Sequence, residues 1–395
     1  MNTYQYSGKS AILFSLLTLS FVAQSDDLSW HGFVAQGVIQ SENSNFINDD
    51  GDVSFELTEV GLNASYRFNS TLRLAGQGVY LNGGHRYEEG TRLDYLFLDW
   101  QAINTLDWQV NVHLGRYKNY HWVYSATRDV PHTRPSIVLP QSVYFDVFRD
   151  VALGSDGVAL IGTTSNALGD WEVNLSYGTS HVSRGQTENL LSTLSTGNLE
   201  QDYVQQFSVF WQPADSNLKL GLSLLDSDFS YAQGERDFYI NGEATSQRFQ
   251  LAGIYNTESW ELVFEFMRER AIYSDFLFPG FKSDQTSEAV YAQGRYYLTP
   301  EVSLMMRLDI FDLNRKDRDG SALSARTGGT TPEYFGFQDQ ATIGLSWEFA
   351  PNWQVQTEFH RAKGTARLAP VLVPDTQTNS SKYWNVWALQ VMHWF

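Results

Sequence analysis

The chain has 395 residues, no cysteine, 15% aromatic residues and a net charge of −18 at pH 7. The missing cysteine excludes disulfides, thiolate metal sites and thiol nucleophiles, and the acidic charge argues against binding to nucleic acid, whose phosphates require a basic surface. Mean hydropathy is −0.33. A transmembrane barrel has a similarly ordinary value, because its strands alternate lipid-facing and lumen-facing side chains.

Residues 1–25 have the pattern of a secretory signal peptide. Lys9 is the only charged residue before an apolar run from Ala11 to Ala23, and the small residues Ala23 and Ser25 suit the positions before a cleavage site. The run is too short to cross about 30 Å of hydrocarbon as a helix. We therefore expect a cleaved signal peptide and a mature chain that begins at Asp26, with no transmembrane helix after it.

From residue 26 onward the hydrophobic period is two. Residues Trp171–Tyr177 and Ala341–Phe349 alternate strictly between apolar and polar side chains, which a strand places on opposite faces. The segment 92–104 is less regular, with apolar residues on both faces. The pattern predicts sixteen strands, each long enough to cross a bilayer at a tilt. They cover residues 28–41, 53–69, 72–82, 92–104, 108–118, 151–165, 171–182, 203–213, 218–231, 244–257, 260–273, 286–299, 302–314, 335–350, 353–365 and 383–395.

The connections between these segments alternate between short and long. Short clusters of turn-forming residues recur, for example at 69–71 and 350–352, as expected for short periplasmic turns and long extracellular loops. Four strands begin with Trp directly after a turn, which is typical of an aromatic girdle at a membrane interface and argues against a soluble β-sandwich. The four are Trp108, Trp171, Trp260 and Trp353. We predict an all-β fold over residues 26–395, a transmembrane antiparallel barrel that must close to pair every backbone group in hydrocarbon.

The eight hairpins and the terminal strand ending in Phe395 resemble the Gram-negative outer-membrane porins with sixteen strands. His393 departs from that pattern, since an apolar residue is usual there. The connection after the fifth strand is similar to segments of phosphate-selective-type porins; it contains Gly115–Lys118, Thr127–Pro131, Leu139–Ser142 and Tyr144–Asp146. The resemblance implies a homotrimer in contact with outer-membrane lipid, and a third loop, residues 119–150, that folds into the barrel as a constriction.

The third loop combines three prolines with several aromatic residues, a composition typical of an ordered insert. From Arg116 to Asp150 five cations stand against three carboxylates, although the chain as a whole is acidic. Two hypotheses remain open for these cations. They line a constriction that selects anions, or they pair with lumen carboxylates and hold the loop in place. The candidate residues are Arg116, Lys118, Arg128, Arg134 and Arg149, with Asp129 and Asp146.

Strand parity places further charges on the lumen wall. Opposite the lipid-facing Trp260 and Phe264 lie acidic residues of the same strand, and arginines fall on the polar faces of other strands. Such a mixed wall can create a transverse field that orients polar solutes, or the charges can simply neutralise one another in pairs. The wall candidates are Glu261, Glu265, Arg248, Arg295 and Arg307.

The motifs of catalytic chemistry are missing from the sequence. Neither H-E-x-x-H nor G-x-S-x-G occurs, and no histidine can be assigned a partner serine and an orienting acid. We predict no enzymatic activity, no cofactor and no metal site. The predicted function is a porin, a water-filled channel for passive diffusion of small hydrophilic solutes and ions. The alternatives are a channel selective for phosphate-like anions or sugars, and a non-conducting structural or adhesive barrel.

Overall fold

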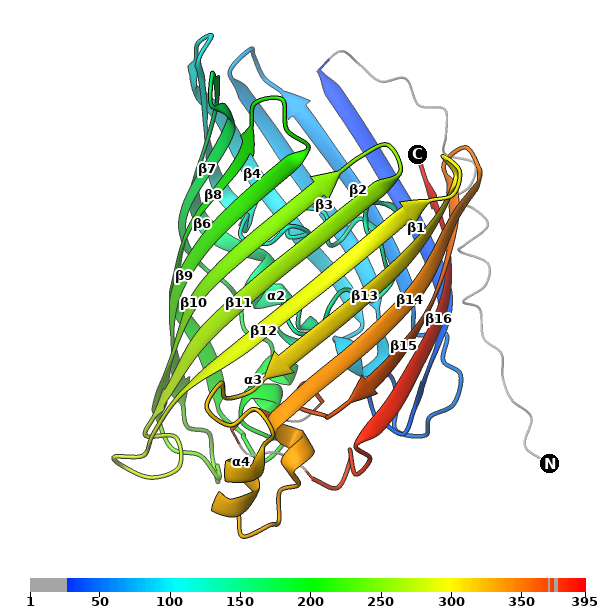
Figure 1. Ribbon diagram of the computed structural model, residues 1–395. Coiled ribbons are helices and arrows are strands. Elements are labelled where there is room, and N and C mark those ends of the chain that lie inside the picture. The colour runs from blue at the N-terminus through cyan, green and yellow to red at the C-terminus, as the bar shows by residue number, and fades with distance from the viewer. Residues whose placement is uncertain (1–26, 369, 373–375) are drawn as a thin grey trace, which may run out of the picture.

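The structure, a computed structural model, describes residues 27–368, 370–372 and 376–395. The expected signal peptide, residues 1–25, lies outside the described residues. Sixteen strands form one closed antiparallel barrel in which each strand pairs with its neighbours in sequence and β1 pairs with β16 (Figure 1). The prediction of a sixteen-stranded barrel is confirmed. The strands are β1 Leu28–Glu42, β2 Thr58–Arg67, β3 Leu72–Asn82, β4 Gly90–Asn104, β5 Trp108–Lys118, β6 Gly154–Asn166, β7 Gly169–Thr179, β8 Asn198–Pro213, β9 Leu218–Ala232, β10 Gly242–Asn256, β11 Trp260–Ser274, β12 Lys282–Tyr297, β13 Val302–Asp312, β14 Phe337–Ala350, β15 Trp353–Lys363 and β16 Tyr383–Trp394.

The boundaries differ from the predicted ones where the period of two is interrupted. β8 begins five residues before the predicted residue 203, because the register shifts between Gln201 and Tyr203 and reverses the alternation there. β4 carries two such shifts, one opposite Gln77–Gly78 and one between Gln101 and Ile103, which explain its apolar residues on both faces. Residues 53–57 are not part of β2, since Ser54 instead forms an isolated bridge with Ile39.

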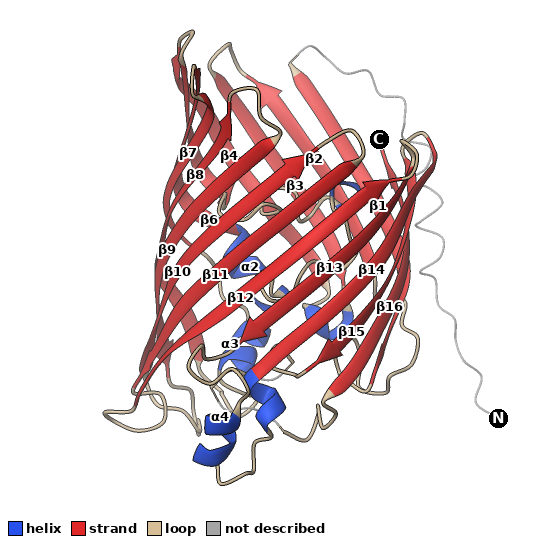
Figure 2. Ribbon diagram, viewed as in Figure 1, coloured by secondary structure: helices blue, strands red, loops and turns tan. Residues whose placement is uncertain are grey.

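The two ends of the barrel differ. Short turns join the strands at one end, shown at the top of Figure 1, and long loops join them at the other. The helical pieces all belong to the long loops, and among them α2 lies within the outline of the barrel (Figure 2). They are η3 Gly84–Arg86, η4 Pro131–Thr133, η5 Asp146–Phe148, α2 Arg149–Leu153, α3 Arg184–Leu190, α4 Ser321–Arg326 and η6 Glu333–Gly336. None of the helices described is long and apolar enough to cross a membrane.

The outer face of the barrel is an apolar band with aromatic residues near the turns. Outward-facing Leu262 and Phe264 are about half exposed, whereas Glu265 beside them is buried on the inner face. Near the turns, aromatic rings of neighbouring strands pack together, for example Trp260 with Tyr296 at 4.5 Å between ring centroids. Such rings suit the boundary between hydrocarbon and headgroups.

His393, the residue that departs from the porin pattern, belongs to this aromatic girdle. Its ring stacks on Trp353 with 4.5 Å between centroids, and its Nδ1 lies 2.9 Å from the carbonyl oxygen of Asn352. The imidazole therefore has an apolar face against an indole and a polar edge against a turn, as a residue at the interface requires. Next to it, the backbone groups of Phe395 and Gly32 exchange two hydrogen bonds of 3.0 Å, which complete the junction of β1 and β16.

The apolar band predicts a depth-dependent cost of charge on the outer face. Leu308 of β13 lies in the middle of the band, and Leu298 lies in a turn; both side chains are exposed. Leu308→Arg should lower the free energy of unfolding in phosphatidylcholine vesicles by about 2–4 kcal/mol, and Leu298→Arg by no more than about 1 kcal/mol. Urea denaturation curves measure both values. Equal costs at the two positions would contradict the assigned membrane depth.

Candidate pore constriction

The third loop, predicted over residues 119–150, covers residues 119–153 between β5 and β6 and lies inside the barrel. Its Arg134 donates from Nη2 to Glu59 Oε1 of β2 at 2.7 Å, and its Val123 N–H donates to Glu265 Oε1 of β11 at 3.0 Å. β2 and β11 stand on nearly opposite sides of a ring of sixteen strands. The loop therefore extends across the lumen and is bound to the wall on both sides.

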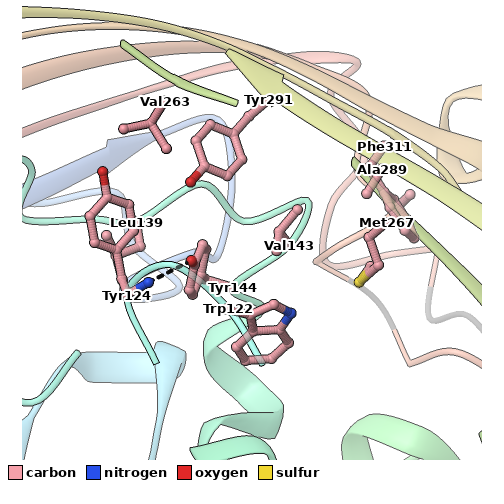
Figure 3. Close-up of a cluster of buried hydrophobic side chains, with 11 residues drawn as sticks. Trp122, Tyr124, Leu139, Val143, Tyr144, Val263, Met267, Ala289, Tyr291 and Phe311 are labelled. Atoms are coloured by element: carbon pink, nitrogen blue, oxygen red, sulfur yellow. Dashed lines mark hydrogen bonds between the residues drawn. The ribbon is translucent and has the colours of Figure 1, made fainter. Parts of the chain in front are cut away.

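Glu265 is the centre of one attachment. This fully buried carboxylate accepts hydrogen bonds from the hydroxyls of Tyr144 and Tyr291, each at 2.6 Å, and from Gln250 Nε2 at 2.8 Å, in addition to the Val123 N–H. The Tyr144 hydroxyl also accepts a hydrogen bond from the backbone N–H of Tyr124 at 2.9 Å (Figure 3). Four donors meet the hydrogen-bonding capacity of this buried carboxylate, so it can hold the loop without an unsatisfied oxygen.

Glu358 of β15 is the centre of a second attachment. Its two oxygens accept hydrogen bonds from the backbone N–H groups of Ile137 and Val138 at 2.9 and 2.8 Å, and Oε1 lies 2.8 Å from His360 Nε2. Arg307 of β13 donates from Nη2 to the carbonyl oxygen of Val138 at 2.9 Å. The loop backbone here has no strand partner, so wall side chains supply the acceptors and donors that a buried backbone needs.

Most of the loop cations are paired. Asp146 accepts from Arg86 Nε at 2.7 Å and from Arg128, and Asp129 pairs with Lys118 at 2.9 Å and with Arg149. Burial opposes the ionisation of Asp146, but the adjacent Arg86 and Arg128 outweigh it and hold the pKa of this carboxyl below its usual range. Lys118 also contacts Asp94. This geometry matches the hypothesis in which the cations hold the loop in place.

Arg116 is a correction to the predicted set. Its side chain forms an ion pair of 2.7 Å with Asp156 of β6, and both residues continue the outward-facing series of their strands, after Leu114 and before Val158. The sequence interpretation grouped Arg116 with the loop because it is close in sequence. Strand parity instead places it on the outer face, at the end of the barrel that carries the long loops.

Three of the predicted wall residues, Glu261, Arg295 and Arg248, face the lumen in ion pairs, whereas Glu265 and Arg307 hydrogen-bond to the third loop. Arg295 donates to Glu261 at 2.6 Å and Arg248 contacts Glu269 at 3.2 Å. Toward the turns, the lumen face carries charges that reach solvent: Arg73, 47% exposed, pairs with Asp99, and Lys219, 38% exposed, lies 3.6 Å from Glu172. The inner wall thus offers both signs of charge to water on this side of the loop.

Comparison with known proteins gives the fold. No family model and no curated protein sequence matches the chain. The chain is similar in structure to OmpT, an outer membrane protein of Vibrio cholerae (TM-score 0.57, 13% identity, covering 94% of this chain and 99% of that one). It is also similar to OmpF of Salmonella typhi in complex with daunomycin (TM-score 0.57, 12% identity, covering 93% of this chain and 97% of that one). A third similar structure is an anion-selective porin from Comamonas acidovorans (TM-score 0.55, 11% identity, covering 93% of this chain and 99% of that one).

These matches cover nearly the full length of both chains, at identities of 11–13%. Similarity at this level establishes the fold. The resemblance to porins in the sequence is therefore confirmed for the fold, which is that of an outer-membrane barrel.

Removing the Glu358 carboxylate should release the loop. Glu358→Ala leaves two buried backbone N–H groups without an acceptor, at about 1–3 kcal/mol each, so the population with a detached loop should rise by at least roughly 30-fold. The rate of cleavage within residues 119–150 by proteinase K, in detergent micelles, measures that population. Glu348→Ala, which removes an exposed carboxylate, is the control and should behave as wild type. An unchanged cleavage rate in Glu358→Ala would show that this attachment does not hold the loop.

Proposed function

We propose that the chain is a Gram-negative outer-membrane porin, a water-filled channel for passive diffusion of small hydrophilic solutes and ions, with residues 1–25 as a cleaved signal peptide. The observation that carries the proposal is the third loop, which crosses the lumen on buried carboxylates from several strands. A loop fixed in this way narrows the pore to a constant size. The charged inner wall favours a lumen filled with water. The proposed role is passive, without catalysis.

We also propose a homotrimer, in which a second copy packs against the outer face of β2 and β3. Outward positions on these strands carry Gly76 and Gly78, and Ala64 lies directly opposite Gly76. Small residues permit close approach of two surfaces within a membrane. In the first loop beside them, Phe55 is 71% exposed, although it is a large apolar side chain. A neighbouring subunit would cover it.

Single-channel recording in a planar bilayer tests the porin proposal. The purified protein should give stepwise openings with a current proportional to voltage, grouped in threes if the trimer forms. A barrel that folds correctly, as judged by its heat-dependent mobility in gels, but passes no current would contradict the proposal and favour the structural or adhesive barrel.

Reversal of one lumen charge should change the ion preference. Arg73→Glu alters the charge of the inner wall by two units, so the ratio of cation to anion permeability should rise roughly twofold or more. The reversal potential under a salt gradient measures this ratio. Arg361→Glu makes the same change on the outer face, where Arg361 contacts Asn385, and should leave the ratio unchanged. An equal effect of both substitutions would argue against conduction along this wall.

A further inference from the structure

A cavity of about 170 Å³ lies inside the barrel, between the third loop and the wall formed by β8–β13, on the side of the long loops. Its lining is largely apolar, in contrast to the charged wall near the turns. Among the lining residues, Trp122, Val143 and Met267 belong to one buried cluster (Figure 3). Further lining comes from Phe145, Phe229, Tyr273 and Phe311.

Three side chains that line the cavity keep hydrogen-bond donors without a partner among the residues described. They are Trp122 at Nε1, Arg248 at Nε and Nη1, and Arg367 at Nε, and each of these atoms is buried. One nitrogen of each arginine is bound within the protein: Arg248 Nη2 contacts Glu269 at 3.2 Å, and Arg367 Nη2 donates to the carbonyl oxygen of Ser142 at 2.7 Å. A buried donor without an acceptor costs free energy, so these donors would stabilise an acceptor that enters the cavity.

The aromatic lining orients the two arginines. The guanidinium carbon of Arg367 lies 3.6 Å from the ring centroid of Phe311 and 4.6 Å from that of Phe145, and that of Arg248 lies 5.1 Å from the ring of Trp122. A guanidinium that stacks by its face keeps its N–H groups at the edge, where they can bind a carboxylate.

The charge in the lining favours a single anion. The lining itself holds two arginines, Arg248 and Arg367, and one carboxylate, Glu269. The buried Asp309, which lies outside the lining, also attracts Arg367. Burial lowers the pKa of Arg367 to about 10, with Glu269 opposing that shift, so this guanidinium is still protonated at neutral pH. The unpartnered donors of Arg248 and Arg367 therefore carry the case for an anion, because charged donors bind a carboxylate more strongly than they bind a neutral oxygen.

We propose that this cavity binds an organic monoanion with a compact apolar body, a carboxylate on a single aromatic ring or a short branched chain. The carboxylate accepts from the free donors of Arg248, Arg367 and Trp122, and the body contacts Met267 and Phe229. The volume of the cavity suits a single aromatic ring, because an apolar protein cavity of about 150 Å³ accommodates benzene. The inference rests on the proposed function in one respect: the solute reaches the cavity through the lumen.

Isothermal titration calorimetry of the full barrel in detergent, with benzoate as the probe, tests the site without requiring conduction. Benzoate should bind once per chain. Benzyl alcohol, which has the same ring without charge, and acetate, which has the charge without the ring, should each bind at least tenfold more weakly. Inorganic phosphate that binds as tightly as benzoate would overturn the inference of an apolar body.

Variants separate the two parts of the site. Arg248→Gln and Arg367→Gln should each weaken benzoate binding at least tenfold, whereas Arg361→Gln on the outer face should not change it. If the arginine variants fail to fold, Ala271→Phe provides the second test, since it fills the lining at Ala271 and leaves both arginines in place. It should abolish benzoate binding. Unchanged binding in Ala271→Phe would overturn the site.

The outcome is distinguishable from that of the porin proposal. Current through the bilayer without benzoate binding overturns the site and leaves the channel. Benzoate binding that responds to these variants in a barrel without current supports the site and overturns the channel.

Discussion

The structure depends on one constraint, the need of every backbone N–H and C=O in hydrocarbon to have a hydrogen-bond partner within the protein. A sheet satisfies this only when it closes, and here it does so where β1 meets β16. Closure separates an outer face in contact with lipid from an inner face that encloses a lumen. The period of two in the sequence then assigns each strand residue to one of these faces, so apolar and charged residues can alternate without conflict.

The same constraint explains how a long loop can be ordered inside the barrel. The backbone of residues 119–153 has no strand to pair with, so its buried N–H groups require acceptors from the wall. Glu265 and Glu358 provide them, and the loop cations are neutralised by Asp129, Asp146 and Glu59. Most of the buried charges therefore serve to attach the loop to the wall. Charges that reach solvent, such as those of Arg73 and Lys219, remain free of the loop and face the water of the lumen.

Much of the fold could be predicted from sequence, because alternation, turn residues and the aromatic girdle are local signals. Prediction was wrong by several residues at the start of β8, where a register shift reverses the alternation. The candidate site was harder to predict from the sequence. Arg116 was misplaced because closeness in sequence was given more weight than strand parity. Arg86 and Arg367, which lie in other long loops, were missed, since nothing local distinguishes an arginine that folds back into the lumen from one in solvent.

The most direct measurement uses the absence of cysteine from the chain. Lys219→Cys places a single thiol on the inner face of β9, and Leu220→Cys places one on the outer face at the next position. A charged, membrane-impermeant thiol reagent should change the single-channel current of Lys219→Cys and leave that of Leu220→Cys unaltered. No current in either variant, or the same response in both, would contradict the account of a water-filled lumen enclosed by a lipid-facing wall.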